Sequence, residues 1–328
     1  MKSLTIGGSL VGQRLDRALA RLVPDLGLRG RRRLLEDGLV FRNGRPGRAA
    51  DRLRAGDRLD LQPLPTPWEI PRATCGHDAP RLLGRQGELC FLYKPAGMHT
   101  VALAGRAGLS LEGCLPELLP GETAQLLQRL DFNTSGLVCA ALGVAAGEAF
   151  RRAESAGHCE KYYVALLHGI LREPRTVRAG LDTSHRRKSR ILPSCGESSR
   201  WTEFWPLLTW QCAEAASVLA GLGAVTQAEA AEAAEGLSLG LPLSLTLAAC
   251  RIRRGARHQI RAHAAALGLP LWGDSLYGPQ QSGAAASTFF LHHGLLRLPS
   301  ASHAVLPPWS LPDAGMTSVR KWFEKCAE

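Results

Sequence analysis

The chain has 328 residues, of which 45% are hydrophobic, and a formal net charge of +11. This length suits about two domains with a sizeable core, and the positive charge favours an anionic partner such as nucleic acid. Nine cysteines are present. The sequence has no C-x-x-C pair, no P-loop and no apolar run long enough to span a membrane, so none of the corresponding sites is indicated. We therefore expect a cytoplasmic protein with reduced cysteines and no metal.

Positive charge is concentrated at the N-terminus. Residues 1–62 contain one lysine and thirteen arginines against seven acidic residues, a net charge of +7. Arginine forks onto phosphate oxygens and stacks on bases, so this composition is typical of an RNA-binding module. A basic module that contacts another protein is the alternative.

The pattern of residues 1–62 predicts a small α/β domain. The expected elements are a helix from Leu15, a helix over Arg29–Asp37, a strand over Val40–Arg42, a turn at Asn43-Gly44 and a strand over Arg58–Leu61. This order resembles the S-four-like RNA-binding domain, named after a small-subunit ribosomal protein. Arg31, Arg32 and Arg33, at the basic start of the second helix, are therefore candidates for RNA contact.

Four prolines between residues 63 and 71 indicate a linker, which we expect to be extended over 63–87. The rest of the chain alternates between strand and helix patterns. The expected strands are Leu89–Lys94, Leu137–Leu142, Lys161–Ile170 and Leu243–Ile252, and the expected helices are Val144–Ala156, Arg257–Leu267 and Ser318–Lys325. Residues 212–236 are Ala-rich, with no aromatic residue, Lys or Arg, and are interpreted as an inserted helical or flexible excursion between two strands.

One loop places an acidic side chain directly before an apolar strand. Residues 128–140 read QRLDFNTSGLVCA, with Asp131 in a polar turn that local side-chain to backbone hydrogen bonds can hold. An acidic residue at the lip of a buried strand is a candidate nucleophile. The residues alone leave open the alternative that Asp131 only caps the turn.

Two further segments, 161–169 (KYYVALLHG) and 250–278 (CRIRRGARHQIRAHAAALGLPLWGDSLYG), extend the pattern. Together the three resemble the RluA family of RNA pseudouridine synthases. That family has the blocks R-L-D-x-x-T-S-G, K-x-Y-x-A-x-x-x-G and G-R-T-H-Q-I-R-x-H, then G-x-P and G-D-x-x-Y-G, in this order. The matching residues are Arg129, Leu130, Asp131, Thr134, Ser135, Gly136, Lys161, Tyr163, Ala165, Gly169, Gly255, His258, Gln259, Ile260, Arg261, His263, Gly268, Pro270, Gly273, Asp274, Tyr277 and Gly278.

The resemblance implies an α+β fold, with a catalytic domain over 88–328 built on a central, mainly antiparallel mixed sheet with flanking helices. It also implies an enzyme that isomerises uridine in RNA without a cofactor. The nucleophile is assigned to Asp131, and Arg261 is expected to meet its carboxylate bidentately. Tyr163 is expected to stack on the uracil, and its hydroxyl to assist the final proton removal. Arg129 is expected to fill the gap left by the extruded base.

Other residues of these blocks have simpler expected roles. Lys94, in a segment that looks like the family's K-P-x-G block, is a candidate for phosphate contact, with a plain strand-end charge as the alternative. Arg257 is a second RNA-contact candidate, on the same helix face as Arg261. The remaining residues are expected to be structural: His258 and Gln259 at a helix start, with substrate contact as their alternative, Asp274 and Tyr277 in a turn, and His292-His293 in packing.

Several positions depart from the family pattern: Gln128, where His is usual, Phe132 and Asn133, where charge is common, and Ala256 and Arg257 in place of Arg and Thr. They affect the expected fit to RNA more than the chemistry. Large-subunit ribosomal RNA is the expected substrate of a monomeric enzyme, with transfer RNA as the alternative. Two other functions compete, namely a non-catalytic RNA-binding or ribosome-assembly protein, and a glycosylase, which would need a second carboxylate near Asp131.

Overall fold

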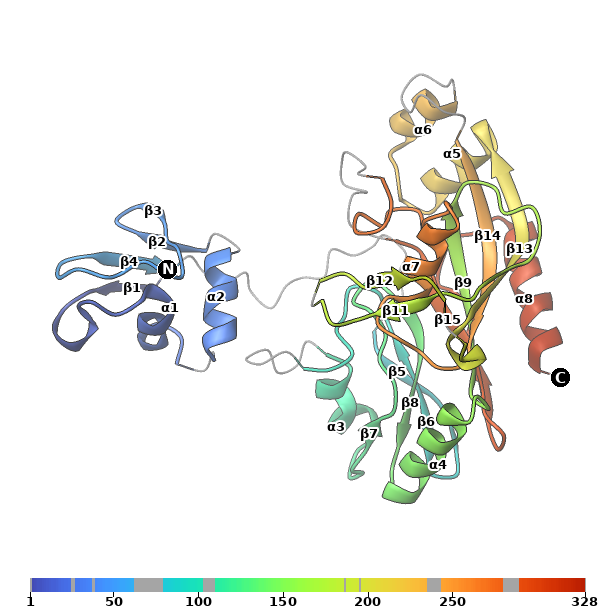
Figure 1. Ribbon diagram of the computed structural model, residues 1–328, viewed down its shortest axis with the longest axis horizontal. Coiled ribbons are helices and arrows are strands. Elements are labelled where there is room, and N and C mark those ends of the chain that lie inside the picture. Colours follow the sequence, from blue (N-terminus) through green and yellow to red (C-terminus); the bar gives the residue numbers. More distant parts are fainter. Residues whose placement is uncertain are drawn as a thin grey trace. The chain divides into compact units, whose positions relative to one another are not determined.

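The computed structural model describes residues 2–24, 27–36, 39–61, 79–102, 110–185, 187–194, 196–234, 243–279 and 289–327 (Figure 1). The chain divides into two compact units. One contains residues 1–72 and 101–113, and the other contains residues 73–100 and 114–328. Among the helices of these described ranges, none has the length and apolar composition needed to cross a membrane.

The first unit contains an antiparallel four-stranded sheet of order β1-β4-β2-β3. Its elements are β1 (Lys2–Thr5), α1 (Leu15–Ala18), α2 (Leu28–Glu36), β2 (Val40–Arg42), β3 (Arg45–Pro46) and β4 (Arg58–Leu61). The turn between β2 and β3 uses Asn43 and Gly44 at φ +50° and +77°, as the dipeptide predicts. Leu15, Leu19 and Leu59 are fully buried in its core, and the helix predicted from Leu15 continues after α1 as a 3-10 turn, Leu19–Arg21.

The second unit is built on one large sheet of order β10-β13-β14-β9-β15-β8-β6-β5. Its strands are β5 (Arg81–Gln86), β6 (Leu89–Lys94), β8 (Ser135–Ala141), β9 (Glu160–His168), β10 (Arg175–Val177), β13 (Thr202–Gln211), β14 (Ser244–Ile252) and β15 (Leu291–Arg297). Two short strands, β7 (Gln125–Leu126) and β16 (Ser302–Ala304), pair with β8 and β15. Among the described pairs only β15 with β8 is parallel, so the predicted mixed, mainly antiparallel sheet is confirmed.

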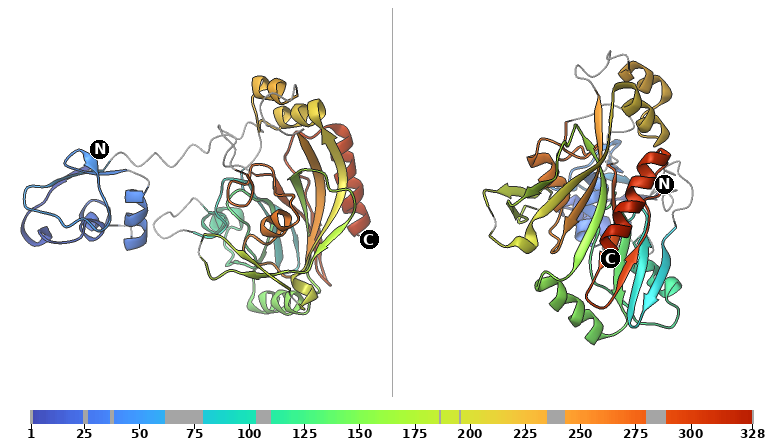
Figure 2. Two further views of the ribbon diagram at one scale, coloured as in Figure 1. Left: turned by 45° about the horizontal axis from the view of Figure 1, so that its top comes forward. Right: turned by 90° about the vertical axis from the view of Figure 1, so that its right-hand side faces the viewer.

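Helices and a small hairpin flank this sheet (Figures 1 and 2). They are α3 (Leu115–Leu118), α4 (Val144–Ser155), α5 (Cys212–Gly221), α6 (Gln227–Ala234), α7 (Gln259–Ala266), α8 (Asp313–Ala327) and the hairpin of β11 (Gly180–Asp182) and β12 (Arg190–Leu192). Figure 2 shows α8 lying along one face of the sheet. Val319 and Phe323 of α8 join Leu219 of α5 and the sheet residues Leu245 and Leu247 in the main core.

Several predicted boundaries differ from the structure. The strand β5 lies inside the segment 63–87, which was predicted as a linker, and residues 62–78 lie outside the described ranges. A tight turn at Gly87, with φ +59°, folds β5 back onto β6, so the sheet starts before the predicted domain boundary. Of the two alternatives predicted for the excursion at 212–236, helical or flexible, its described part shows the helices α5 and α6, and α5 packs in the core.

The two C-terminal helices also start away from their predicted residues. The helix expected at Arg257 begins at Gln259, because His258 takes a left-handed backbone conformation, with φ +57°, at its N-cap. The last helix begins at Asp313, five residues before the predicted start at Ser318. The carbonyl oxygen of Pro312 there accepts the backbone N–H groups of Gly315 and Met316.

Candidate active site

The Asp131 loop is held against the sheet where β8 begins. The backbone N–H of Thr134 donates to the carbonyl oxygen of Asp131 at 3.1 Å, which closes the turn. Gly136 follows at φ +115°, and a Cβ atom there would lie 2.2 Å from the carbonyl oxygen of His293 on β15. The parallel pairing of β8 with β15 therefore requires glycine at this position, and it fixes the loop that carries Asp131.

Lys94, at the end of β6, is fully buried under the same loop. Its ammonium nitrogen donates to the carbonyl oxygens of Pro95 at 2.7 Å, Met98 at 2.8 Å and Phe132 at 3.3 Å. Burial lowers the pKa of Lys94 to about 7, while the nearby Asp131 carboxylate opposes that shift. This placement contradicts the expected phosphate contact, because the ammonium already donates to three backbone oxygens, one of which belongs to the Asp131 loop.

Arg261 connects two carboxylates. It projects from α7, and its Nη1 lies 3.2 Å from Asp131 Oδ2. Its Nε and Nη2 donate to the two oxygens of Asp274 at 2.7 and 2.8 Å. The expected bidentate pair is therefore formed with Asp274 rather than with Asp131, and Asp131 receives a single donor from a guanidinium locked by its neighbour.

Asp274 is a second carboxylate at the site, but it serves as a brace. Only 2% of it is exposed, and its Oδ1 also accepts the backbone N–H groups of Leu276 and Tyr277 at 3.0 and 3.2 Å. The turn expected from the G-D-x-x-Y-G pattern is thus present. Because both oxygens are engaged, Asp274 is poorly suited to act as the second acid or base that glycoside hydrolysis needs.

Tyr163 lies on β9 and stacks on His293 of β15, with ring centroids 4.5 Å apart and planes 20° apart. Burial, followed by the charge of Asp131, raises the pKa of the Tyr163 hydroxyl, so it is protonated at neutral pH. Its neighbour Tyr162 points to the other face of the sheet, into the main core, and donates to Glu160 at 3.0 Å. This alternation is the one expected for a strand.

Two buried histidines, His292 and His293, and Gln128 form hydrogen bonds that fix the strands next to Tyr163 and the Asp131 loop. His293 donates from Nδ1 to the carbonyl oxygen of Leu137 at 2.6 Å, and burial lowers its pKa to about 3, so its ring is neutral. Gln128, the departure from the family's usual His, donates to the same carbonyl at 3.2 Å. His292 accepts from Ser135 Oγ at 2.9 Å and donates to the carbonyl of Val305 at 3.0 Å, so the packing role predicted for this pair is confirmed.

His258 lies closer to the site than its expected bracing role requires. Its Nε2 is 3.9 Å from Asp131 Oδ1, and its Nδ1 is 3.2 Å from the hydroxyl of Tyr277. Burial lowers its pKa, and the Asp131 carboxylate opposes that effect. The Tyr277 hydroxyl in turn accepts the backbone N–H of Ser189 at 2.7 Å. The pattern H-Q-I-R signals a helix start, but only the left-handed conformation of His258 turns its ring toward Asp131.

The structure places the RNA-contact candidates in different surroundings. Arg129 is exposed two residues before Asp131, as an inserting side chain must be. Arg257 precedes α7 rather than lying on it, and it donates to the carbonyl oxygens of Thr183 and His185, which fixes these two residues of the segment after β11. Its direct contact with RNA stays a prediction.

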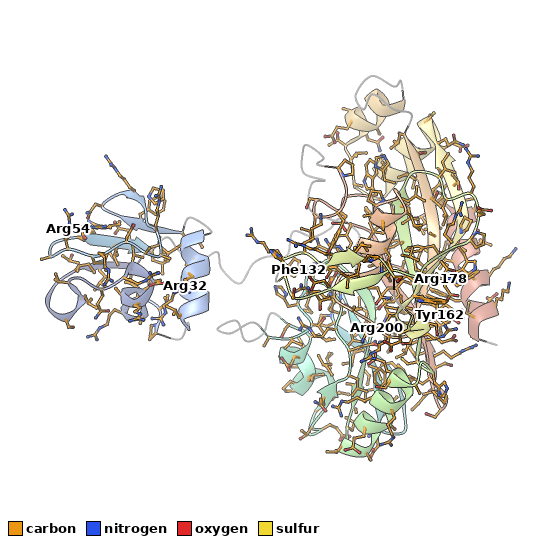
Figure 3. The ribbon with its side chains drawn as sticks, viewed as in Figure 1. Arg32, Arg54, Phe132, Tyr162, Arg178 and Arg200 are labelled. Atoms are coloured by element: carbon orange, nitrogen blue, oxygen red, sulfur yellow. The ribbon has the colours of Figure 1, made fainter. Side chains whose placement is uncertain are left out.

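Two of the three arginines of the first unit that were predicted to contact RNA form hydrogen bonds within that unit. Arg31 donates to the carbonyl oxygen of Arg17 at 3.1 Å, and Arg32 donates to the buried carboxylate of Asp16 at 2.7 Å (Figure 3). The side chain of Arg33 lies outside the described part of the structure. Arg32 remains 48% exposed, so its pair with Asp16 leaves part of the guanidinium open to solvent.

Comparison with known proteins identifies the family of the chain. The family model described as RNA pseudouridylate synthase matches residues 88–266, more than half of the chain. The chain therefore belongs to the RNA pseudouridylate synthase family, and it is an isomerase that acts on RNA.

Within this family, the similar proteins indicate that the chain is an RluA-type enzyme. One is an uncharacterized RNA pseudouridine synthase of Chloroflexus aurantiacus, 29% identical over 87% of this chain and 82% of the relative. Another is the ribosomal large subunit pseudouridine synthase D of Xanthomonas campestris pv. campestris, 26% identical over 85% of this chain and 75% of the relative. The fold is similar to that of human RNA pseudouridylate synthase domain containing 1, with a TM-score of 0.50 and 23% identity over 70% of this chain and 84% of the human one.

Proposed function

We propose that this enzyme converts a uridine of large-subunit ribosomal RNA into pseudouridine, with Asp131 as the nucleophile. The observation that carries the assignment is the contact of Arg261 Nη1 with Asp131 Oδ2, at 3.2 Å, from a guanidinium that Asp274 holds by two further bonds. The ribosomal substrate is supported by relatives named ribosomal large subunit pseudouridine synthase D.

The reaction breaks the bond from ribose C1′ to uracil N1 and forms a bond from C1′ to C5. We assign Asp131 to the attack that frees the base, and Arg261 to orienting this carboxylate without consuming it. The hydrogen at C5 leaves as a proton, and N1 gains one. Asp131 is only 24% exposed, so its surroundings can help retain the freed base while it turns.

Tyr163 is proposed to contact the uracil with its ring. The ring is already fixed by its stack on neutral His293, so it can offer a flat apolar surface to the turned base. The raised pKa of its hydroxyl disfavours a phenolate, which argues against Tyr163 alone as the base that removes the C5 proton. We therefore assign it chiefly to positioning.

RNA binding away from Asp131, Tyr163 and Arg261 is assigned to two regions. Exposed Arg129 is proposed to enter the gap left by the extruded uridine, which offsets part of the few kcal/mol that unstacking costs. Residues 1–62, with their net charge of +7, are proposed to be an S-four-like domain that contacts phosphates.

The test is pseudouridine mapping of total RNA from cells with and without this protein. We expect one or more uridines of large-subunit ribosomal RNA to lose the modification, and wild type but not Asp131→Asn to restore it. Asp313→Asn, an exposed aspartate on α8, is the matched control and should restore it fully. Loss confined to transfer RNA would overturn the substrate, and restoration by Asp131→Asn would overturn the nucleophile.

A further inference from the structure

Phe132 is an aromatic residue on the surface directly beside Asp131. It is 37% exposed, and it is the one aromatic side chain among the exposed large hydrophobic residues of the described part of the chain (Figure 3). The other five are aliphatic: Val11, Leu82, Val144, Ile191 and Leu192. The family pattern commonly has a charged residue at this position, so neither the fold nor the nucleophile explains a phenylalanine here.

Phe132 is held by one contact to its ring and by two hydrogen bonds to its backbone. Its centroid lies 4.6 Å from that of His99, with the ring planes 46° apart. Its backbone carbonyl oxygen accepts the N–H of Gly97 at 2.9 Å and the buried ammonium of Lys94 at 3.3 Å. A fixed ring loses little conformational freedom when it binds a partner, so it is a better stacking surface than a mobile one.

The surroundings of the ring fit a nucleic acid. Arg129, three residues earlier, is exposed and is the side chain assigned to the gap left by the extruded uridine, and that uridine must reach Asp131, the adjacent residue. Every nucleobase has a flat face that stacks on an aromatic ring, and extrusion of one nucleotide leaves its neighbours partly unstacked. An exposed ring next to the nucleophile is therefore placed to meet a base next to the target.

We propose that Phe132, supported by His99, stacks on an unpaired base adjacent to the target uridine and so helps to select the RNA. This inference rests on the proposed function, because it assumes that the uridine reacts at Asp131. It names the feature of the substrate that the enzyme recognises, a flanking nucleotide that is free to leave its helical stack.

The substrate of the first experiment is RNA isolated from cells that lack this protein and that were grown with 5-tritiated uridine. The enzyme is added to this RNA and the release of tritium is measured, because C5 loses its hydrogen in the reaction. Phe132→Leu, which keeps an apolar side chain but no aromatic face, should lower kcat/KM by about 5- to 150-fold, mainly through KM. Phe132→Trp should retain most of the wild-type value. Val144→Ala, at an exposed apolar residue of α4, is the control and should match wild type.

The second experiment identifies the base. Short RNAs that span the mapped uridine are made with one abasic nucleotide at each flanking position in turn. The penalty of Phe132→Leu should disappear in one of these RNAs and persist in the others, because the stacking partner is then already missing.

The outcomes separate the two proposals. No tritium release by wild type would overturn the proposed function itself. Normal release by wild type with an equal kcat/KM for Phe132→Leu would overturn only the stacking role. A penalty that Phe132→Trp fails to rescue, or that is the same for every abasic RNA, would show that the ring supports the loop or contacts a protein instead.

Discussion

Arg261 reaches Asp131 with a single nitrogen, Nη1, at 3.2 Å, and leaves one oxygen of that carboxylate without a guanidinium donor. A bidentate pair would have occupied both oxygens of Asp131. Asp274 instead takes the other two donor positions of the Arg261 guanidinium, so the positive charge is fixed in place while one oxygen of Asp131 stays available for the attack proposed for it. In the proposed mechanism, Arg261 orients the carboxylate and Asp131 reacts.

Asp274→Asn should reduce turnover although Asp274 is not expected to touch the substrate. The amide offers one acceptor where Arg261 now uses two, so the guanidinium is less firmly held and Asp131 is less well oriented. We expect kcat to fall by about 100-fold, since a misplaced catalytic group costs on that order. Stability should fall by about 3 kcal/mol, because a buried ion pair is broken.

Tritium release and urea unfolding measure these two effects. Glu324→Gln removes an exposed carboxylate from α8 and should change neither quantity. A fully active Asp274→Asn variant would mean that Arg261 holds Asp131 without the brace.

Arg261→Lys tests the geometry of the guanidinium rather than its charge. A lysine carries the same charge but is a point donor on a flexible stem, so it cannot pair two carboxylates through a planar fork. We expect kcat to fall by at least about 100-fold while RNA binding, measured by filter retention, stays within about two-fold. Arg320→Lys on the exposed face of α8 is the matched control. Full activity of Arg261→Lys would show that charge alone is sufficient.

Gly136→Ala should disrupt the sheet at the start of β8. The added Cβ would lie 2.2 Å from the His293 carbonyl oxygen, on a backbone with φ +115°. Gly121→Ala is a fitting control, because Gly121 also has a positive φ, +76°, but has open space around the added atom. We expect a loss of about 1 kcal/mol for Gly121→Ala and of more than about 4 kcal/mol, or failure to fold, for Gly136→Ala in urea unfolding. Equal losses in the free energy of unfolding for the two variants would mean that β8 and β15 can move apart at little energetic cost.

The sequence was sufficient for the parts of the fold that depend on local pattern. The strand Leu89–Lys94 was predicted at its observed bounds, and those of β8, β9 and β14 within two residues, because each is a long apolar run that only a buried strand explains. The residues that the resemblance assigned to chemistry, Asp131 and Arg261, do lie in contact.

What the sequence did not predict depends on contacts between distant segments. The bidentate partner of Arg261 is Asp274, thirteen residues along the chain, and Asp274 was predicted only as a turn residue. Lys94 was predicted as a candidate phosphate ligand, but it is buried under the Asp131 loop. This burial depends on the packing of two segments that are distant in the sequence, so no local pattern reveals it. The parallel pairing of β15 with β8, which explains Gly136, is likewise a long-range event.

The buried histidines should make the fold sensitive to acid. Burial lowers the pKa of His292 to about 4, whereas an unfolded histidine has a pKa of about 6.5. Between these values the unfolded chain binds the extra proton, so stability is lost as the pH falls from about 6.5 toward 4. His292→Gln should lower the slope of unfolding free energy against pH in this window by up to ~1.4 kcal/mol per pH unit. An unaltered slope for His292→Gln would contradict this assignment.

Exposed arginines of the first unit should determine how strongly salt weakens RNA binding. Arg45, Arg48 and Arg54 are exposed, and each phosphate contact that is lost reduces the slope of log K against log salt by roughly 0.7 to 0.9. Replacing all three with glutamine should therefore reduce the magnitude of the slope by roughly two to three. The matched control removes three exposed charges from α8, at Arg320, Lys321 and Lys325, and should change the slope little. If both triple variants flatten the slope equally, net charge accounts for binding and the first unit has no special role.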